Sequence, residues 1–204
     1  LRGLQFEQFN GSLINDSRIL ILSNCILNSI KANCSSLING NNNSIIEKSK
    51  FFNTSGQIYL ASNSIISQNL FLKHNGSCNS QFINGSSSKL KITNNLFIDL
   101  TGTDLSSTGN DSTFILNNTF YKSATNASSF IRFDSYSNTK NLVYNNIFNR
   151  TIGNDFIFNA VFNGDSSTTI LDISYNFLTT ALTSNSTYSR YKTKSRNNFI
   201  GLSP

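Results

Sequence analysis

The sequence predicts an all-β fold, a single-stranded right-handed parallel β-helix (solenoid) of about eight coils. Three observations lead to this prediction. A short motif, written in full as SKLKITNNLFIDL at residues 88–100, recurs along the chain. Its apolar positions form two fixed columns, and none of the repeats shows the 3.6-residue periodicity of a helix. The chain also contains 17 Phe and 7 Tyr, whereas disordered chains are poor in aromatic residues.

Each repeat is centred on one anchor residue, which is Asn in all repeats but one. The anchors are Asn24, Ser49, Asn69, Asn95, Asn118, Asn146, Asn176 and Asn198, at intervals of 25, 20, 26, 23, 28, 30 and 22 residues. Irregular spacing around a fixed motif indicates a constant scaffold segment that is joined by loops of different lengths.

Two apolar columns accompany the anchors. Three residues before them stand Ile21, Ile46, Ile66, Ile92, Ile115, Val143, Ile173 and finally Ser195. Two residues after them stand Ile26, Phe51, Phe71, Phe97, Phe120, Phe148, Leu178 and Ile200. We interpret each repeat as a strand that ends near the anchor, a bend at the anchor, and a second strand. Asn suits such a bend because it tolerates left-handed backbone and hydrogen-bonds locally.

Stacking of the coils explains why the columns are so uniform. Parallel strands lie about 4.8 Å apart, so anchor would lie on anchor and Phe on Phe. The Asn amides could then bond to one another as a ladder, while the Phe rings form a continuous core.

A third side of each coil is predicted from a second apolar patch between successive anchors. These patches lie at residues 36–40, 58–60, 81–85, 130–133 and 160–164. Three short strands in about 25 residues indicate a parallel β-helix, because the hairpins of a sandwich alternate every 8–12 residues or so. Crossover chirality favours the right hand. We expect residues 1–204 to form one domain of a longer protein or an assembly, because solenoid ends need polar caps and no capping helix is evident.

The segments ITNNLFIDL, ILNNTFYKS and LVYNNIFNR resemble repeats of the right-handed parallel β-helix family with the pectin-lyase-like fold. The closing NNFIGLSP resembles the last-coil segment of such domains in secreted bacterial proteins. The resemblance covers nearly the whole chain and implies a secreted or surface-displayed protein. It is specific for fold and not for activity, because this fold serves lyases, hydrolases, tailspikes, adhesins and surface layers.

The most prominent charged column comprises Lys73, Asp99, Lys122 and Arg150, each four residues after its anchor. One interpretation is a solvated strand face on which opposite charges alternate between neighbouring strands. The other is a face that contacts a ligand.

A second candidate surface is the alternating basic stretch at residues 190–196. Its cations are Arg190, Lys192, Lys194 and Arg196, and strict alternation places them on one face of an extended strand. The stretch could protect an exposed sheet edge, bind an acidic polymer with Tyr188 and Tyr191 stacking on sugars, or contact another chain. We expect no nucleic acid partner, because no recognised nucleic-acid-binding module is present.

The candidate catalytic and metal-binding residues are few. In the family that the chain resembles, lyases place acidic residues on adjacent coils to bind calcium, with a Lys or Arg as base. Here Asp104 and Asp155 share a register, but Ala127 occupies it in the coil between them. No Asp pair suits a hydrolase, and His74, beside Lys73 in a polar turn, is predicted to be exposed. We therefore predict no catalytic residue, metal ligand or cofactor, with calcium implied only if the chain is a lyase.

The three cysteines, Cys25, Cys34 and Cys78, are predicted to be small buried residues, although Cys25 and Cys34 could also close a short loop. No stretch of about 18 apolar residues is present, so no membrane-spanning segment is predicted.

The leading functional hypothesis is a non-catalytic extracellular or cell-surface scaffold, adhesin-like, that binds acidic carbohydrate. The net charge of +6 is compatible with such a ligand. One alternative is a polysaccharide-processing enzyme of the uronan lyase type. Another is a structural subunit of a surface layer or filament, which would stack on itself or on neighbouring domains.

Overall fold

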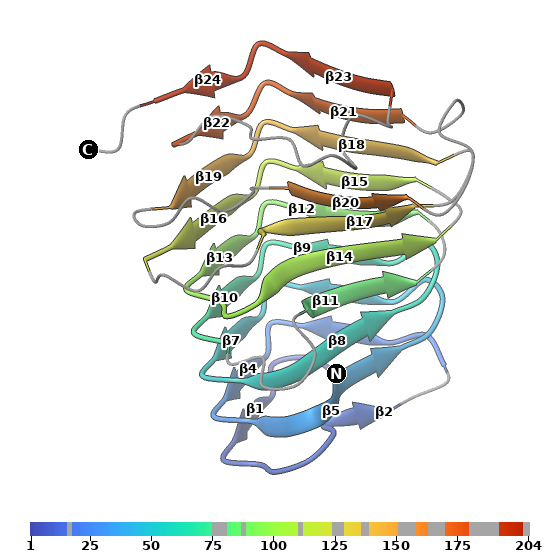
Figure 1. The fold of residues 1–204 in the computed structure, drawn as a ribbon. Helices are drawn as coiled ribbons and strands as arrows, with labels where there is room; N and C mark the ends of the chain where they lie inside the picture. Colours follow the sequence, from blue (N-terminus) through green and yellow to red (C-terminus); the bar gives the residue numbers. More distant parts are fainter. Residues whose placement is uncertain are drawn as a thin grey trace.

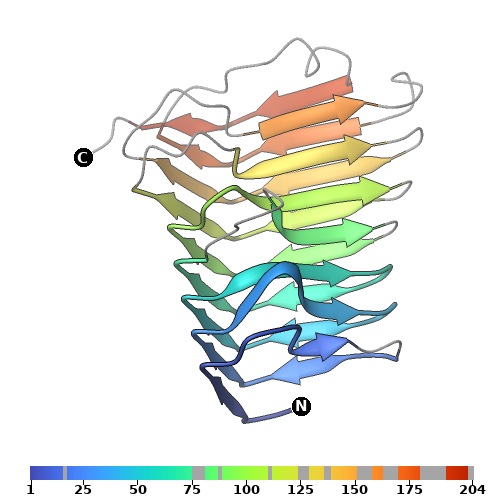
Figure 2. The same ribbon diagram turned by 60° about the horizontal axis from the view of Figure 1, so that its bottom comes forward.

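Each coil of the chain passes through three parallel sheets in turn, and successive coils stack along one axis (Figures 1 and 2). The computed structural model describes residues 1–15, 18–74, 81–86, 89–109, 112–123, 129–135, 139–150, 158–162, 170–179 and 192–201. Within these ranges the regular structure consists of strands alone. The predicted parallel β-helix is therefore confirmed.

Sheet B holds nine described strands. In spatial order they are β1 (Gln5–Glu7), β4 (Ile26–Asn28), β7 (Lys50–Phe52), β10 (Leu70–Leu72), β13 (Leu96–Ile98), β16 (Thr119–Lys122), β19 (Ile147–Arg150), β22 (Phe177–Leu178) and β24 (Phe199–Ile200).

Sheet C holds seven described strands. They are β2 (Ile14–Asn15), β5 (Lys31–Gly40), β8 (Ser55–Leu60), β11 (Gln81–Ser86), β14 (Thr103–Gly109), β17 (Ile131–Ser135) and β20 (Phe158–Phe162).

Sheet A holds eight described strands. They are β3 (Ile21–Ser23), β6 (Ile45–Glu47), β9 (Ile65–Ser67), β12 (Leu90–Thr93), β15 (Thr113–Leu116), β18 (Lys140–Tyr144), β21 (Ile170–Ser174) and β23 (Lys192–Arg196). The sequence predicts about eight coils, and the three sheets contain nine, seven and eight described strands.

The solenoid is right-handed. In Figure 1 the strands of sheet C run from left to right in front, those of sheet A run from right to left behind, and the chain climbs from its blue N-terminus to its red C-terminus. This hand is the one that the sterics of parallel crossovers favour.

The core is a stack of inward columns, one from each sheet. In sheet B the column of Phe51, Phe71, Phe97, Phe120 and Phe148 is fully buried. Successive ring centroids lie 4.8, 4.9, 4.7 and 4.8 Å apart. Because the strands themselves repeat at about this distance, each ring lies directly over the ring of the preceding coil, as the sequence predicted.

The bend between sheets A and B is made by the residue before each anchor, not by the anchor. The residues at this position have φ between 50° and 60°; they are Lys48, Gln68, Asn94, Asn117, Asn145, Tyr175 and Asn197. The left-handed backbone turns the side chain of each of these residues outward, where it is exposed. The side chain of the next residue, the anchor, then points into the stack. The bend was predicted at the anchor and therefore lies one residue earlier than predicted.

The anchor amides form a continuous ladder. Nδ2 of each Asn donates to Oδ1 of the Asn in the next coil, across 3.0 Å in the first four steps and 3.1 Å in the last; the series runs through Asn69, Asn95, Asn118, Asn146, Asn176 and Asn198. The backbone N–H of the first five donates to the same oxygen. Each Nδ2 also donates to a backbone carbonyl of the preceding coil, such as Ile66 for Asn95, at 3.0 Å. The ladder thus ties three successive coils together.

Asn24 does not belong to this ladder. It is exposed and left-handed, with φ of 54°, and Cys25 takes the anchor position. Cys25 N donates to Ser49 Oγ at 3.1 Å, and Ser49 N donates to Asn69 Oδ1 at 2.9 Å. Cys25 itself is a free, buried thiol, in agreement with the prediction of a buried small residue. When the repeats are aligned on their polar residues, this shift is missed, because Cys25 is apolar and the residue before it is Asn.

An earlier coil precedes the first predicted repeat. Gly3 occupies the bend with φ of 62°, and β1 pairs in parallel with β4, with Phe6 beside Leu27. The anchor position is filled by Leu4, whose carbonyl accepts from Ile26 N at 2.9 Å. This coil carries no polar anchor, which is why the motif did not reveal it.

Within the described ranges, no helix has the length and apolar character needed to cross a membrane.

Candidate functional site

The four residues of the predicted charged column do not share a face. Lys73 and Asp99 follow β10 and β13 with left-handed backbone, at φ of 54° and 50°. Strands β16 and β19 instead continue through Lys122 and Arg150, which pair in register. As a result Lys73 is exposed and Asp99 half-buried, whereas Lys122 and Arg150 are buried. Two of the four predicted ligand contacts therefore lie inside the coil.

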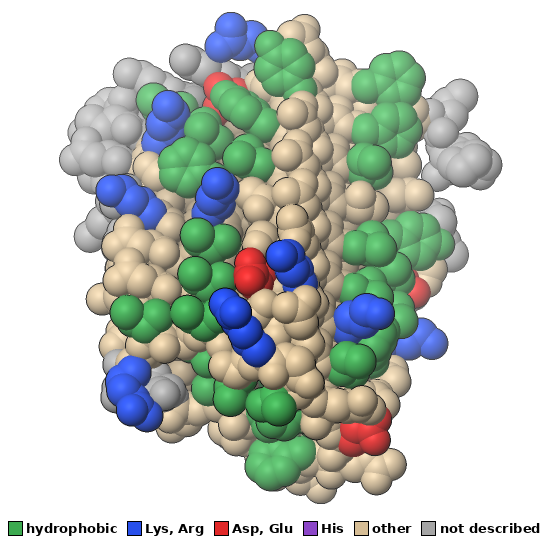
Figure 3. All heavy atoms as spheres, turned by 180° about the vertical axis from the view of Figure 1, so that it is seen from behind, with side chains coloured by type: hydrophobic (Ala, Val, Ile, Leu, Met, Phe, Trp, Pro, Cys, Tyr) green, Lys and Arg blue, Asp and Glu red, His purple; other side chains and the backbone are tan. Residues whose placement is uncertain are grey.

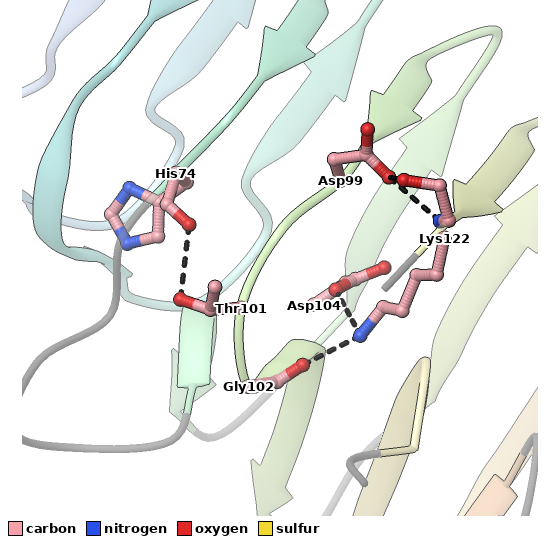
Figure 4. A network of polar contacts seen from close by, with 7 residues as sticks. His74, Asp99, Thr101, Gly102, Asp104 and Lys122 are labelled. Atoms are coloured by element: carbon pink, nitrogen blue, oxygen red, sulfur yellow. Dashed lines mark hydrogen bonds and ion pairs between the residues drawn. The ribbon is translucent and has the colours of Figure 1, made fainter. Parts of the chain in front are cut away.

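Asp99 has a local structural role. Its Oδ1 accepts hydrogen bonds from Ser123 N at 2.7 Å and Ser123 Oγ at 2.8 Å. These bonds join the turn after β13 to the turn after β16 in the next coil (Figure 4).

Lys122 forms a buried ion pair with Asp104 (Figure 4). Nζ lies 2.8 Å from Asp104 Oδ1, and the two side chains are only 4% and 1% exposed. Nζ also donates to the Gly102 carbonyl at 2.6 Å and lies 5.1 Å from the ring centre of Phe130. The pair joins β14 of one coil to β16 of the next.

Arg150 contributes a second cation to the same part of the interior. Its guanidinium carbon lies 5.2 Å from the ring centre of Phe130. Burial raises the pKa of Asp104 to about 6, although Lys122 and then Arg150 act to lower it. Desolvation thus outweighs attraction at this carboxyl group. We refer to Asp104, Lys122, Phe130 and Arg150 as the interior cluster.

His74 lies in the interior, contrary to the prediction of an exposed side chain. It is 2% exposed, and its ring centre lies 4.0 Å from that of Phe82. The left-handed bend at Lys73 turns the following side chain inward. Burial lowers the pKa of His74 to about 3, so the imidazole is neutral at pH 7. Its backbone carbonyl accepts from Thr101 Oγ1 at 3.1 Å (Figure 4).

The basic stretch is in part an ordered strand. Lys192, Lys194 and Arg196 belong to β23, which pairs in parallel with β21 and places Arg196 opposite Ser174. Arg196 is exposed. Arg190 lies outside the described residues. The extended strand that the charge alternation predicts is therefore present at residues 192–196.

Beside β23, the outer face of sheet A carries a carboxylate held by two hydroxyl groups. Asp172 stands between Leu171 and Ile173, both fully buried, and so belongs to the outer row of β21. Its Oδ2 accepts from Tyr144 Oη at 2.5 Å, and its Oδ1 accepts from Ser174 Oγ at 2.6 Å. Desolvation and the bond to Asp172 raise the pKa of Tyr144 to about 12. The phenol is thereby fixed as a hydrogen-bond donor.

An exposed aromatic ring stands next to this group. Tyr175 is 57% exposed, and its ring meets that of Tyr144 edge to face at a centroid distance of 6.2 Å. The Arg196 guanidinium is close enough to act on Tyr144 by lowering its pKa, and Arg196 N donates to Ser174 Oγ at 3.2 Å. We call Tyr144, Tyr175 and Arg196 the tyrosine patch.

The patch belongs to a longer outer surface. Figure 3, which views the molecule from the side of sheet A, shows hydrophobic side chains gathered in two columns on either side of a polar ridge, with lysine and arginine side chains scattered over the same face. On sheet B the outward residues include Leu96, Ile147 and Phe199, which are 38%, 44% and 64% exposed.

No group of three or more His, Cys, Asp or Glu side chains that could hold a metal ion occurs among the residues that the structure describes.

Comparisons with protein-family models, with curated proteins and with solved structures find no match. The parallel β-solenoid therefore rests on the strand pairing of this chain, and the site must be judged by its own geometry.

The sequence reasoning missed the tyrosine patch, although one signal pointed to it. Tyr175 precedes the anchor Asn176, at a position where neighbouring repeats carry Asn, Gln or Lys. A bulky aromatic residue with positive φ is uncommon. An exposed tyrosine at a strained bend is a sign of a surface role, since packing does not require it there.

Proposed function

We propose that this chain is a non-catalytic scaffold of the adhesin type that acts outside the cell or at its surface, and that it binds acidic carbohydrate at the tyrosine patch. The observation that carries the proposal is that two exposed residues, Tyr175 and Arg196, stand on neighbouring coils, where Tyr175 N donates to the Arg196 carbonyl at 3.0 Å. We also propose that the chain is a divergent member of the pectin-lyase-like β-helix group, on the basis of its motifs and its parallel coils.

The chemistry of the patch suits a sugar that carries a carboxylate. Tyrosine offers an apolar ring face together with a polar edge. Arginine offers a planar fork of donors that matches a carboxylate. Lys192 and Lys194 share β23 with Arg196, so further cations stand in the same strand.

The patch is also held in place before a ligand arrives. The Tyr144 ring is fixed by its bond to Asp172 and by contact with Tyr175. Asp172 in turn is fixed by Ser174. Binding to such a site loses little side-chain entropy, which favours affinity.

The non-catalytic reading is supported by where the ionisable groups lie. The cations that a uronan lyase could use as its base are Lys73, Lys122 and Arg150; Lys73 is exposed, whereas the side chains of Lys122 and Arg150 are buried in the coil. Asp104 and His74 are buried as well. A polymer that lies along the outside of the solenoid would not reach these buried groups.

The test is retention of the protein on immobilised polygalacturonate, alginate and hyaluronate, with dextran as a neutral polymer. We expect retention on at least one uronate polymer and none on dextran. Arg196→Ser should weaken binding by about tenfold or more, the value of one charge-assisted contact. Tyr175→Ala should also weaken binding, because it removes the exposed ring on which a sugar would stack. Added salt should weaken it further.

A matched control is Lys50→Ser, which removes an exposed cation from sheet B and should leave retention unchanged. Equal retention of the wild type, Arg196→Ser and Tyr175→Ala would contradict the proposal. Release of unsaturated or reducing ends from any polymer would contradict its non-catalytic part.

A second candidate function is a structural subunit that associates with copies of itself through sheet B. The exposed Leu96, Ile147 and Phe199 on that face favour it, because exposed apolar surface marks interaction sites. They stand in one row of sheet B, with Thr119 and Phe177 at the intervening coils. Sedimentation velocity at rising concentration would show self-association, and Leu96→Ser with Ile147→Ser should abolish it. A concentration-independent monomer would exclude this function.

A further inference from the structure

The buried contact between Lys122 and Asp104 has the arrangement of two groups that can condense. Nζ and Oδ1 lie 2.8 Å apart, and both side chains are shielded from solvent. Oδ2 of Asp104 has no hydrogen-bond partner among the residues that the structure describes. An amine held against a carboxyl group in a dry site reacts far faster than the same groups free in water, because the translational entropy has already been lost.

We propose that Lys122 and Asp104 form an intramolecular amide, an isopeptide bond between Nζ of Lys122 and Cγ of Asp104. The inference is independent of the carbohydrate-binding function proposed above. It assigns a covalent modification to the interior cluster, which the fold otherwise uses only as a buried ion pair.

The first step is a proton transfer within the pair. A low-dielectric interior penalises charged groups, which lowers the cost of converting the ion pair to two neutral groups. The Lys122 ammonium gives one proton to the Asp104 carboxylate, which leaves a neutral amine and a carboxylic acid. Burial already raises the pKa of Asp104 to about 6, so the acid form is accessible near neutral pH.

The second step forms the carbon–nitrogen bond. The lone pair of Nζ attacks Cγ, and the tetrahedral intermediate then loses one carboxyl oxygen as water, which carries away one hydrogen from Nζ and the acid proton. The remaining Nζ hydrogen stays on the amide. The sum is one ammonium and one carboxylate giving one amide and one water, so no oxidant or external reagent is needed.

Neighbouring groups are placed to assist. The Gly102 carbonyl accepts from Nζ at 2.6 Å and so orients the amine. The Arg150 guanidinium is close enough to Asp104 to lower the pKa of that carboxyl, and such a cation stabilises the negative oxygen of the intermediate. Phe130 lies beside both cationic groups and helps to exclude water, which favours the amide over its hydrolysis.

The product would be a covalent staple between successive coils. Asp104 lies in β14 and Lys122 in β16, on opposite sides of the corner between sheets C and B.

The deciding experiment is intact-mass spectrometry of the 204-residue chain under denaturing conditions, followed by proteolysis. We expect a mass one water molecule below that calculated from the sequence, together with a branched peptide that joins the segments around Lys122 and Asp104. Lys122→Arg, which keeps a cation but lacks a nucleophilic amine, and Asp104→Ala should both show the full calculated mass.

Two results would overturn the proposal. The full calculated mass for the wild type would leave an ordinary buried ion pair. A mass deficit that persists in Lys122→Arg would mean that water is lost elsewhere in the chain. Because the branched peptide from the wild-type chain identifies the two joined residues directly, the assignment does not depend on whether the variants fold.

Discussion

Nδ1 of His74 lies 3.2 Å from Oγ1 of Thr54, and this contact joins two successive coils inside the solenoid. Both side chains are almost fully buried. The imidazole therefore has a polar neighbour on one side and apolar surroundings on the other, which is an environment that accepts the neutral ring and rejects the charged one.

This contact predicts acid sensitivity. The pKa of His74 falls from 6.5 to about 3 on folding, so below pH 6.5 the unfolded chain binds a proton that the folded chain does not. The stability contributed by His74 is complete above pH 6.5 and is lost as the pH falls toward about 3. The loss is on the order of 5 kcal/mol at the acid end.

His74→Leu should flatten the acid limb of the stability curve, measured by urea unfolding between pH 7 and pH 3.5. Leucine is a sensible replacement because Leu100 is buried at the corresponding place in the next coil. At pH 7 the variant loses the partner of Thr54, so Thr54→Val with His74→Leu is the matched control. An unchanged pH dependence in both variants would contradict this role of His74.

The Asn ladder predicts a ranking of substitutions at Asn118. Alanine removes the oxygen that accepts from Asn95 and the donor to Asn146, and unsatisfied buried groups cost about 1–3 kcal/mol each. Serine should cost less, because Ser49 performs the accepting role in its own coil. Denaturant unfolding should give the order wild type, Asn118→Ser, Asn118→Ala. Asn117→Gly, at the exposed bend, should stay near wild type.

The stacked rings predict a steep cost of truncation in sheet B. Phe97→Ala should lower the free energy of unfolding by about 3–5 kcal/mol, because its ring lies between those of Phe71 and Phe120. Phe97→Leu should cost under about 1.5 kcal/mol, since Leu27 and Leu178 occupy the same column. Leu96→Ala on the outer face serves as the control and should change unfolding by about 0.5 kcal/mol. Equal effects at both positions would contradict the inward assignment of Phe97.

The left-handed bends predict stabilising glycine substitutions. Lys48 has φ of 50° and an exposed side chain. A left-handed non-glycine residue costs about 1–2 kcal/mol, against about 0.5–1 kcal/mol for the added freedom of glycine in the unfolded chain. Lys48→Gly should therefore raise the melting temperature by about 2 °C. Asn94→Gly should change it little, because asparagine already tolerates this conformation. A lower melting temperature for Lys48→Gly would show that its side chain stabilises the bend.

Much of this fold follows from local sequence. The inward columns and the ladder from Asn69 onward are written as a fixed order of residue types around each anchor. Stacking of identical side chains stabilises the fold only when neighbouring strands pair in this register. The first repeats were placed less well, because Asn24 stands beside the true anchor, Cys25, and because Leu4 replaces the polar anchor.

The site was harder to predict because one bend decides where a side chain goes. Lys73 and Lys122 hold the same place relative to their anchors, yet a left-handed residue at Lys73 sends it outward, while the strand continues through Lys122 and carries it inward. Neither residue type signals that choice. The contact of Tyr144 with Asp172 likewise joins residues of separate coils and needs the three-dimensional stacking.

The direction of the Asn ladder has a mechanical consequence. Its hydrogen bonds, like those between the strands, connect one coil to the next and lie along the solenoid axis. Tension along that axis would load the coils one at a time, so the molecule would unzip from an end at a force set by a single coil. Tension along the strands would load all bonds of a strand together. A protein of this build is therefore weak when stretched end to end and strong when pulled sideways.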